Sequence, residues 1–147
     1  MLTSHGHGTG GNPIDNDPKI SLDDAYALKT PADNVALYRD WAETYDVEFA
    51  QNRGYQYPQT IADIYFHHAR PDDTPILDVG SGTGLVATAL QERQVINARL
   101  TIDGVDISPE MLAISRTKQV YRHVFEADLT QPIDLPEKQY GAVVSAG

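Results

Sequence analysis

Residues 76–84 read ILDVGSGTG, and this stretch constrains the fold more than any other part of the sequence. The run ILDV has the short, continuous apolar character of a buried parallel strand. Three glycines alternate with small polar residues at its end, and glycines let a backbone approach a ligand closely. The following GTGLVATALQER places Val86, Ala89 and Leu90 at helical spacing. The sequence therefore predicts a strand, a ligand-binding turn and a helix in immediate succession.

The remainder of the C-terminal half repeats this alternation. LTIDGVDI at 100–107 is a second strand, and Ser108 with Pro109 forms a helix start in which serine caps and proline takes the first helical position. YRHVF and YGAVVSAG are the third and fourth strands. This order predicts an α/β fold over residues 75–147, a Rossmann-like parallel sheet with right-handed crossovers and helices on both faces.

The first 19 residues are rich in Gly, Asn, Asp and His and show no periodicity. We predict a disordered tail over residues 1–19. Its two histidines, His5 and His7, make a poor metal site, because a mobile segment must be ordered before it can bind an ion.

Residues 20–74 are predicted to form an N-terminal helical cap that precedes the sheet. Helix starts are indicated at Ser21, at Thr30 with Asp33 three residues later, and near Pro58. The apolar face of the helix that begins at Thr30 consists of Leu37, Tyr38, Trp41, Ala42 and Tyr45.

Composition narrows the classes of function. The chain has 147 residues, 41% of them apolar, which suits one domain with a core. With a net charge of −10, the chain lacks the excess of basic residues that nucleic-acid-binding proteins use to contact phosphates. We therefore expect no nucleic-acid partner. Cysteine is absent, which excludes disulfides and thiolate metal sites. With no membrane-spanning run and no secretory signal, we expect a cytoplasmic protein without a membrane partner.

The glycine segment is compatible with three classes of ligand. A phosphate loop requires a lysine after the last glycine, and none follows Gly84. A dinucleotide fingerprint requires glycine where Leu85 stands, and an acidic residue about 20 positions on. The acidic residue that ends the second strand, Asp106, lies 26 positions after Gly80 (106 − 80). Asp78, just before the loop, would also repel a pyrophosphate.

The third ligand is S-adenosylmethionine (SAM), which carries an ammonium, a carboxylate and a sulfonium but no phosphate. Asp78 could then lie near the ammonium, while the N–H groups of the loop and of the following helix face the carboxylate. Asp106 can accept hydrogen bonds from both ribose hydroxyls. Ile107 and Met111 offer an apolar wall for the adenine. Asp128 could accept from the adenine amino group, although an Asx turn explains it equally well.

The segments LDVGSGTG, GVDISPEML, ADL and YGAVVSAG stand in the order and spacing of class I SAM-dependent methyltransferases, which residues 75–147 resemble. The upstream LYRDWAETYDVEFAQNRGY is similar to the N-terminal region of small-molecule methyltransferase-like proteins, including the group related to the Williams–Beuren region methyltransferase-like protein. The resemblance implies SAM as cofactor and a small-molecule substrate, and we expect no metal site. The cofactor-binding residues that we predict are Tyr45, Asp78, Gly80, Ser81, Gly82, Thr83, Gly84, Asp106, Ile107, Met111, Asp128 and Leu129.

Two departures from the family pattern affect these expectations. The fourth strand opens with Tyr140-Gly141 where the family usually has an aromatic residue followed by aspartate. The sequence supplies four strands, whereas the family sheet has seven in the order 3-2-1-4-5-7-6, so the fourth strand would be an unprotected edge. We therefore expect a domain truncated at its C-terminal end. No catalytic base is predicted, and a non-catalytic SAM-binding or interaction module is the alternative to an enzyme.

Overall fold

The computed structural model describes residues 54–94, 98–135 and 139–146, together with ten positions between Thr30 and Asp46. The predicted tail over 1–19, the helix start at Ser21, and the side chains of Tyr38 and Trp41 lie outside the described residues. Three helices are described in full: α3 (Tyr57–His68), α4 (Leu85–Arg93) and α5 (Pro109–Lys118). Four strands accompany them: β1 (Ile76–Val79), β2 (Ile102–Asp106), β3 (His123–Glu126) and β4 (Ala142–Val144).

The four strands form one parallel sheet in the order β3-β2-β1-β4. Ile76 of β1 pairs with Ile102 of β2 and with Ala142 of β4, so these three side chains lie on the same face. This sheet, with its helices, confirms the predicted Rossmann-like α/β fold. In the part of the chain that is described, β4 is an edge strand, and its Val143 is 64% exposed.

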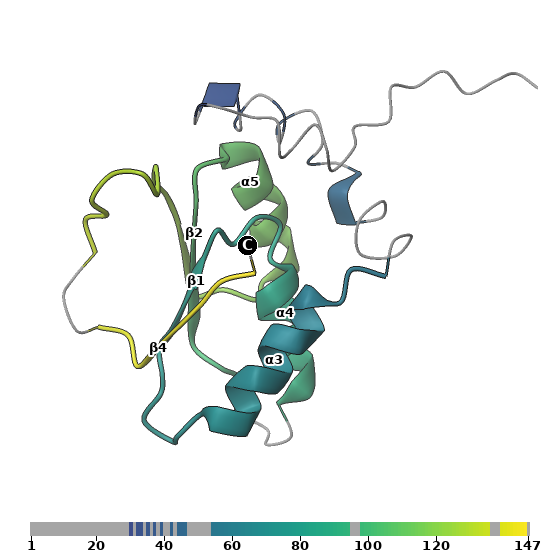
Figure 1. Ribbon diagram of the computed structural model, residues 1–147, viewed down its shortest axis with the longest axis vertical. Coiled ribbons are helices and arrows are strands. Elements are labelled where there is room, and N and C mark those ends of the chain that lie inside the picture. The colour runs from purple at the N-terminus through teal and green to yellow at the C-terminus, as the bar shows by residue number, and fades with distance from the viewer. Residues whose placement is uncertain are drawn as a thin grey trace, which may run out of the picture.

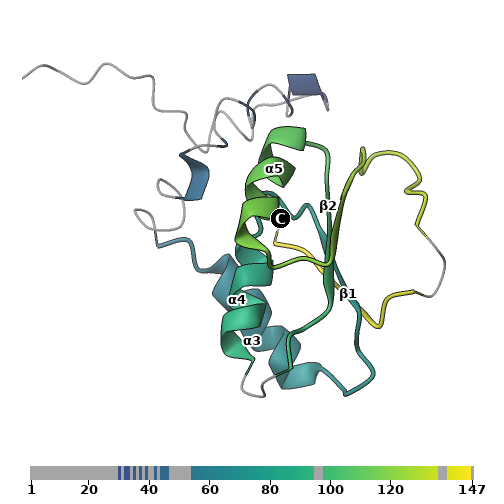
Figure 2. The ribbon, with the colours of Figure 1, turned by 180° about the vertical axis from the view of Figure 1, so that it is seen from behind.

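The helices α3, α4 and α5 lie together on one face of the sheet (Figures 1 and 2). The sequence predicts helices on both faces, and the described elements differ from that expectation. The crossovers from β1 to β2 and from β2 to β3 step in the same direction, and right-handed crossovers in one direction place their helices on one face. The connection from β3 back to β4 forms no helix in its described residues.

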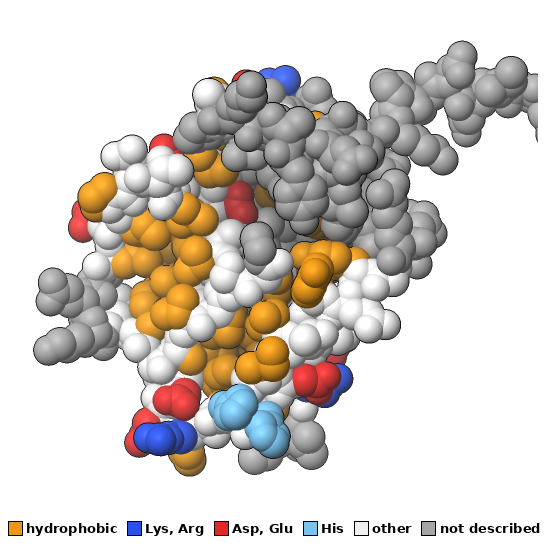
Figure 3. Space-filling view, in the orientation of Figure 1, with side chains coloured by type: hydrophobic (Ala, Val, Ile, Leu, Met, Phe, Trp, Pro, Cys, Tyr) orange, Lys and Arg blue, Asp and Glu red, His pale blue; other side chains and the backbone are white. Residues whose placement is uncertain are grey.

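The core lies between the sheet and this helical layer. Ile76 and Ile102 from the sheet and Leu90 from α4 are fully buried, and Ala62 of α3 packs against the same cluster. Burying one such branched side chain stabilises the fold by about 1.5–3 kcal/mol. Apolar side chains also gather on the surface seen in Figure 3. Exposed large apolar side chains among the described residues include Val143 and Ile64.

Two predicted helix starts are present at the residues that the sequence indicates. The Ser108 hydroxyl accepts the Met111 N–H at 3.2 Å and caps α5, with Pro109 in the first position. Thr30 and Asp33 cap each other reciprocally, because each side chain accepts the other's backbone N–H, at 3.1 and 3.2 Å. No helix in the described part of the chain is both long and apolar enough to cross a membrane.

Candidate functional site

A cavity of about 270 Å³ lies at the carboxyl ends of the strands, where ligands bind in open parallel sheets. Each strand delivers lining residues just after it ends: the glycine loop follows β1, Ile107 follows β2, Leu129 follows β3 and Ala146 follows β4. Helices α4 and α5 and segments upstream of the sheet supply the rest. The lining consists of Tyr45, Tyr55, Pro58, Gly80, Ser81, Gly82, Thr83, Leu85, Val86, Asp106, Ile107, Met111, Leu129 and Ala146.

The loop between β1 and α4 is held by its own backbone. The N–H groups of Gly80 and Ser81 both donate to the Val105 carbonyl, at 2.9 and 3.0 Å. Gly80 and Gly82 have φ angles of +68° and +51°, a left-handed conformation that glycine adopts without steric cost. The turn leads directly into α4, which begins at Leu85. Because Leu85 and Val86 line the cavity, the N-terminus of α4 faces it.

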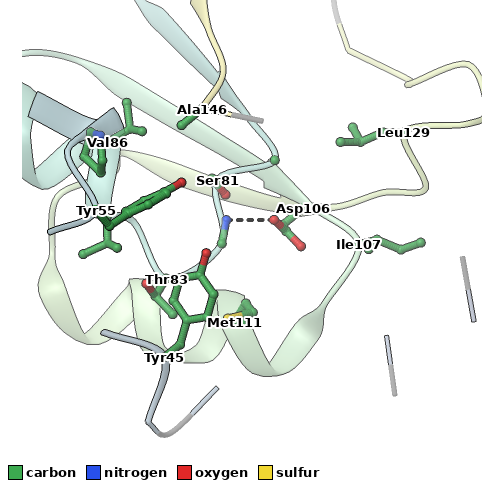
Figure 4. A pocket seen from close by; sticks show the side chains of 14 residues that line it. Tyr45, Tyr55, Ser81, Thr83, Val86, Asp106, Ile107, Met111, Leu129 and Ala146 are labelled. Carbon is green, nitrogen blue, oxygen red and sulfur yellow. Dashed lines mark hydrogen bonds between the residues drawn. The ribbon is translucent and has the colours of Figure 1, made fainter. Parts of the chain in front are cut away.

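Asp106 organises the loop across the cavity (Figure 4). Its Oδ2 accepts the Gly82 N–H at 2.7 Å, and its Oδ1 accepts the Ser108 N–H at 2.9 Å. One carboxylate therefore links the glycine loop to the start of α5. Each carboxylate oxygen has a second lone pair, so Asp106 can still accept hydrogen bonds from a ligand.

These bonds change one expectation about the loop. The sequence predicts that the N–H groups of the glycine turn face a ligand carboxylate. Gly80, Ser81, Gly82 and Gly84 instead donate to acceptors within the protein. The first N–H groups of an α-helix have no acceptor inside the helix, so the first turn of α4 remains the donor set that faces the cavity.

Asp78 does not line the cavity. Its side chain is fully buried on the helix-covered side of the sheet, and its Oδ2 accepts the Tyr121 hydroxyl at 2.6 Å. The pKa of Asp78 is raised to about 7: burial has the largest effect and raises it, the Tyr121 hydrogen bond lowers it, and the Asp106 charge raises it. Asp78 is therefore not placed to contact a ligand ammonium directly. Its charge can act on a ligand only through the intervening glycine loop.

Two further predicted site residues lie outside the lining. Gly84 is buried at the N-cap of α4, with φ of +90°, and faces Tyr121 rather than the cavity. Asp128 lies in a turn, where its Oδ1 accepts the hydroxyl and the N–H of Thr130, at 2.7 and 2.9 Å. These two hydrogen bonds lower the pKa of Asp128. The geometry therefore matches the Asx-turn interpretation of Asp128.

Aromatic side chains from upstream of α3 close one side of the cavity. The rings of Tyr45 and Tyr55 point toward the glycine loop (Figure 4). Asp46, the neighbour of Tyr45, accepts the Thr83 hydroxyl and forms an ion pair with Lys118 of α5. Two contacts therefore hold this segment against the loop.

The sequence reasoning missed five lining residues: Tyr55, Pro58, Leu85, Val86 and Ala146. Leu85 and Val86 could have been predicted, because they begin the helix that directly follows the loop. Ala146 could have been predicted as well, since the carboxyl ends of parallel strands meet at one edge of the sheet. Tyr55 and Pro58 carry no such signal, because only the fold of the upstream segment brings them to the cavity.

The chemistry of the lining is that of an organic-ligand site. Its titratable side chains are Asp106, Tyr45 and Tyr55. Within the described residues, no group of three or more His, Asp or Glu side chains could hold a metal ion. The cavity combines a helix N-terminus, one carboxylate acceptor and an apolar wall formed by Ile107, Met111 and Leu129.

The sequence of this site matches a known family. Residues 76–147 match the family described as methyltransferase domain. This part of the chain belongs to the methyltransferase domain family. The predicted resemblance to class I methyltransferases is therefore confirmed, and the match includes the glycine loop, Asp106 and the four described strands.

Individual relatives extend this result. Human methyltransferase-like protein 27 is 32% identical over 126 residues, which are 84% of this chain and 49% of that protein. CalS10 from Micromonospora echinaspora, an amino pentose methyltransferase solved with SAM bound, is 28% identical, with a TM-score of 0.54 over 69% of this chain and 41% of its own. The TehB-like SAM-dependent methyltransferase from Corynebacterium glutamicum shares the fold at 19% identity, with a TM-score of 0.54 over 76% of this chain and 55% of its own. The chain spans about half the length of these relatives.

Proposed function

We propose that the chain is the SAM-binding part of a SAM-dependent methyltransferase that acts on a small molecule. The observation that carries this proposal is the cavity, where the N-terminus of α4, the Asp106 carboxylate and an apolar wall face one space. These groups match the parts of SAM, which has a carboxylate, a ribose with two hydroxyls and an adenine ring.

Each part of the lining has a distinct role in this proposal. The first turn of α4 donates to the cofactor carboxylate. Asp106 accepts from the ribose hydroxyls while it holds the loop, and Ile107 and Met111 pack against the adenine. Tyr45 and Tyr55 cover the cofactor from the upstream side and exclude water from it.

Bound SAM supplies an activated methyl group on its sulfonium. The protein then has to align an acceptor atom with that methyl group and keep water away. The acidic composition favours a small-molecule acceptor over a nucleic acid. CalS10, which methylates an amino pentose, is consistent with an acceptor of this class.

Titration calorimetry of the 147-residue chain with SAM and S-adenosylhomocysteine tests the binding step. We expect saturable binding of both, and loss of binding in Asp106→Ala because the ribose acceptor is removed. Asp72→Ala removes an exposed carboxylate remote from the cavity lining and should bind like the wild type. Absence of heat with either ligand in a folded wild-type sample would contradict the proposal.

A binding module without catalysis is the second candidate. It is favoured by the lining, whose described side chains contain no histidine or lysine that could act as a general base. Incubation with methyl-labelled SAM and a metabolite extract separates the two candidates. Label transferred to a small molecule supports the enzyme, whereas tight binding without transfer supports the module.

A further inference from the structure

Tyr121 lies behind the glycine loop, on the side away from the cavity. A Cβ atom added at Gly84 would lie 3.0 Å from its Cε2, and a Cβ atom added at Gly104 would lie 3.1 Å from its Cε1. At both positions an added Cβ would therefore press against the ring, and at Gly104 it would also meet the Ser81 Oγ at 2.9 Å. Tyr121 therefore packs between the end of the loop and the middle of β2, and it is not part of the cavity lining.

The Tyr121 hydroxyl contacts the other end of the loop. It donates to Asp78 Oδ2 at 2.6 Å, and Asp78 stands two residues before Gly80. The other carboxylate oxygen, Asp78 Oδ1, is buried and has no hydrogen-bond partner among the described residues. Tyr121 is therefore the one described side chain that donates to this buried carboxylate.

We propose that Tyr121 is a positioning residue for the cofactor loop: its ring supports Gly84, and its hydroxyl holds Asp78 at the start of the loop. This inference rests on the proposed SAM binding and assigns a function to a residue outside the cavity. Both ends of the loop contact one side chain, so the loop keeps the shape in which α4 and Gly82 border the cavity. The ionised form of Asp78 accepts the Tyr121 hydrogen bond most strongly, because charge-assisted hydrogen bonds are stronger than neutral ones.

The arrangement predicts a pH dependence of ligand affinity. Two described groups act on the Asp78 carboxyl: the Tyr121 hydroxyl, which lowers its pKa, and the Asp106 carboxylate, which raises it. The pKa of Asp78, raised by burial to about 7, places its ionisation in the neutral range. The negative charge of ionised Asp78 attracts a ligand ammonium through the intervening glycine loop, without direct contact. Affinity is therefore highest above this pKa and falls as the pH drops below it, by up to about tenfold per pH unit.

The test is the affinity of S-adenosylhomocysteine, measured by calorimetry between about pH 6 and 9. Tyr121→Phe keeps the ring and removes the hydroxyl. We expect weaker binding near pH 7 and a fall in affinity that begins about one to two pH units higher than in the wild type, because Asp78 has lost a hydrogen bond to its charged form. Above that range, the affinity should approach that of the wild type.

Tyr140→Phe is the matched control. The Tyr140 hydroxyl also donates to a fully buried carboxylate, Asp103 Oδ2, at 2.8 Å, but this pair is not part of the loop or the cavity. Its affinity profile should follow that of the wild type. A loss of affinity in Tyr121→Phe that is equal at every pH, or one that Tyr140→Phe reproduces, would show a merely structural role and overturn the inference.

Two other results decide the remaining cases. If Tyr121→Phe does not fold, Asp78→Asn takes its place, because asparagine still accepts the Tyr121 hydroxyl but cannot titrate. Its affinity should be independent of pH over the same range, and a persistent acid loss would overturn the inference. If the wild-type chain folds but does not bind S-adenosylhomocysteine, the proposed function fails and the inference fails with it. If the wild type binds and Tyr121→Phe has the same affinity at every pH, the inference alone fails.

Discussion

Replacing Asp106 by asparagine tests whether one carboxylate organises the cavity. The two oxygens of Asp106 accept the N–H groups of Gly82 and Ser108, at 2.7 and 2.9 Å. Asparagine has the same shape, but one of its two terminal groups is an NH₂ donor. That donor would face a backbone N–H, so one of the two N–H groups loses its acceptor whichever way the amide is turned.

The size of the effect follows from what is lost. A hydrogen bond to a charged group contributes about 1.5–3 kcal/mol, and leaving a buried donor without a partner costs about 1–3 kcal/mol. The Ser108 side is fully buried, so the amide should keep that bond and leave Gly82 without an acceptor. We expect the free energy of unfolding to fall by about 2 kcal/mol. The affinity for S-adenosylhomocysteine should fall about tenfold, because Gly82 and the ribose both lose a charged acceptor.

Urea unfolding followed by circular dichroism measures the first quantity, and calorimetry measures the second. Asp73→Asn is the control, since Asp73 accepts the Arg70 N–H at 2.7 Å in the turn after α3, outside the cavity lining. Its stability should stay within about 0.5 kcal/mol of the wild type. An Asp106→Asn variant that is as stable as Asp73→Asn and binds with wild-type affinity would refute the assignment of Asp106 as the organising group.

Two further substitutions address the loop and its cap. In urea titrations, Gly84→Ala should lower the free energy of unfolding by clearly more than Gly82→Ala. Both residues have positive φ, which costs alanine about 1–2 kcal/mol. Only a Cβ at Gly84 would also meet Tyr121, whereas a Cβ at Gly82 meets nothing within 4 Å. Equal losses would contradict the packing of Tyr121 on the loop. Asp46→Ala removes the partner of Thr83 and Lys118 and should weaken S-adenosylhomocysteine binding about three- to tenfold in calorimetry, because Tyr45 is no longer held over the cavity. Unchanged affinity would show that the cap does not depend on this contact.

Most of the fold could be predicted because its signals are local. The apolar run before Gly80, the cap formed by Ser108 and the proline at the first position of α5 each act within a few residues. The strand order was also predictable, since the family resemblance implied it. That the three described helices share one face was not predicted, although the direction of the crossovers from β1 to β2 and from β2 to β3 already implies it for α4 and α5.

The site was predicted less completely, and Asp78 shows why. Residues 76 and 78 lie on the same face of β1, because side chains alternate along a strand. Once Ile76 is assigned to the core under the helices, Asp78 must be buried there too. Its partner Tyr121 is 43 positions away in the sequence, and no local pattern connects the two residues.

Glycines in and near the loop are required for two different physical reasons, a backbone conformation and the space for a neighbouring side chain. Gly80 and Gly82 line the cavity and have the positive φ angles that the turn requires. Gly84 and Gly104 lie outside the lining: an added Cβ would approach Tyr121 at both positions, and at Gly104 it would also meet Ser81. The glycine-rich motif therefore does more than border a ligand, because Gly84 also leaves room for the ring of Tyr121. A side chain that never reaches the ligand can thus limit which substitutions the ligand-binding loop tolerates.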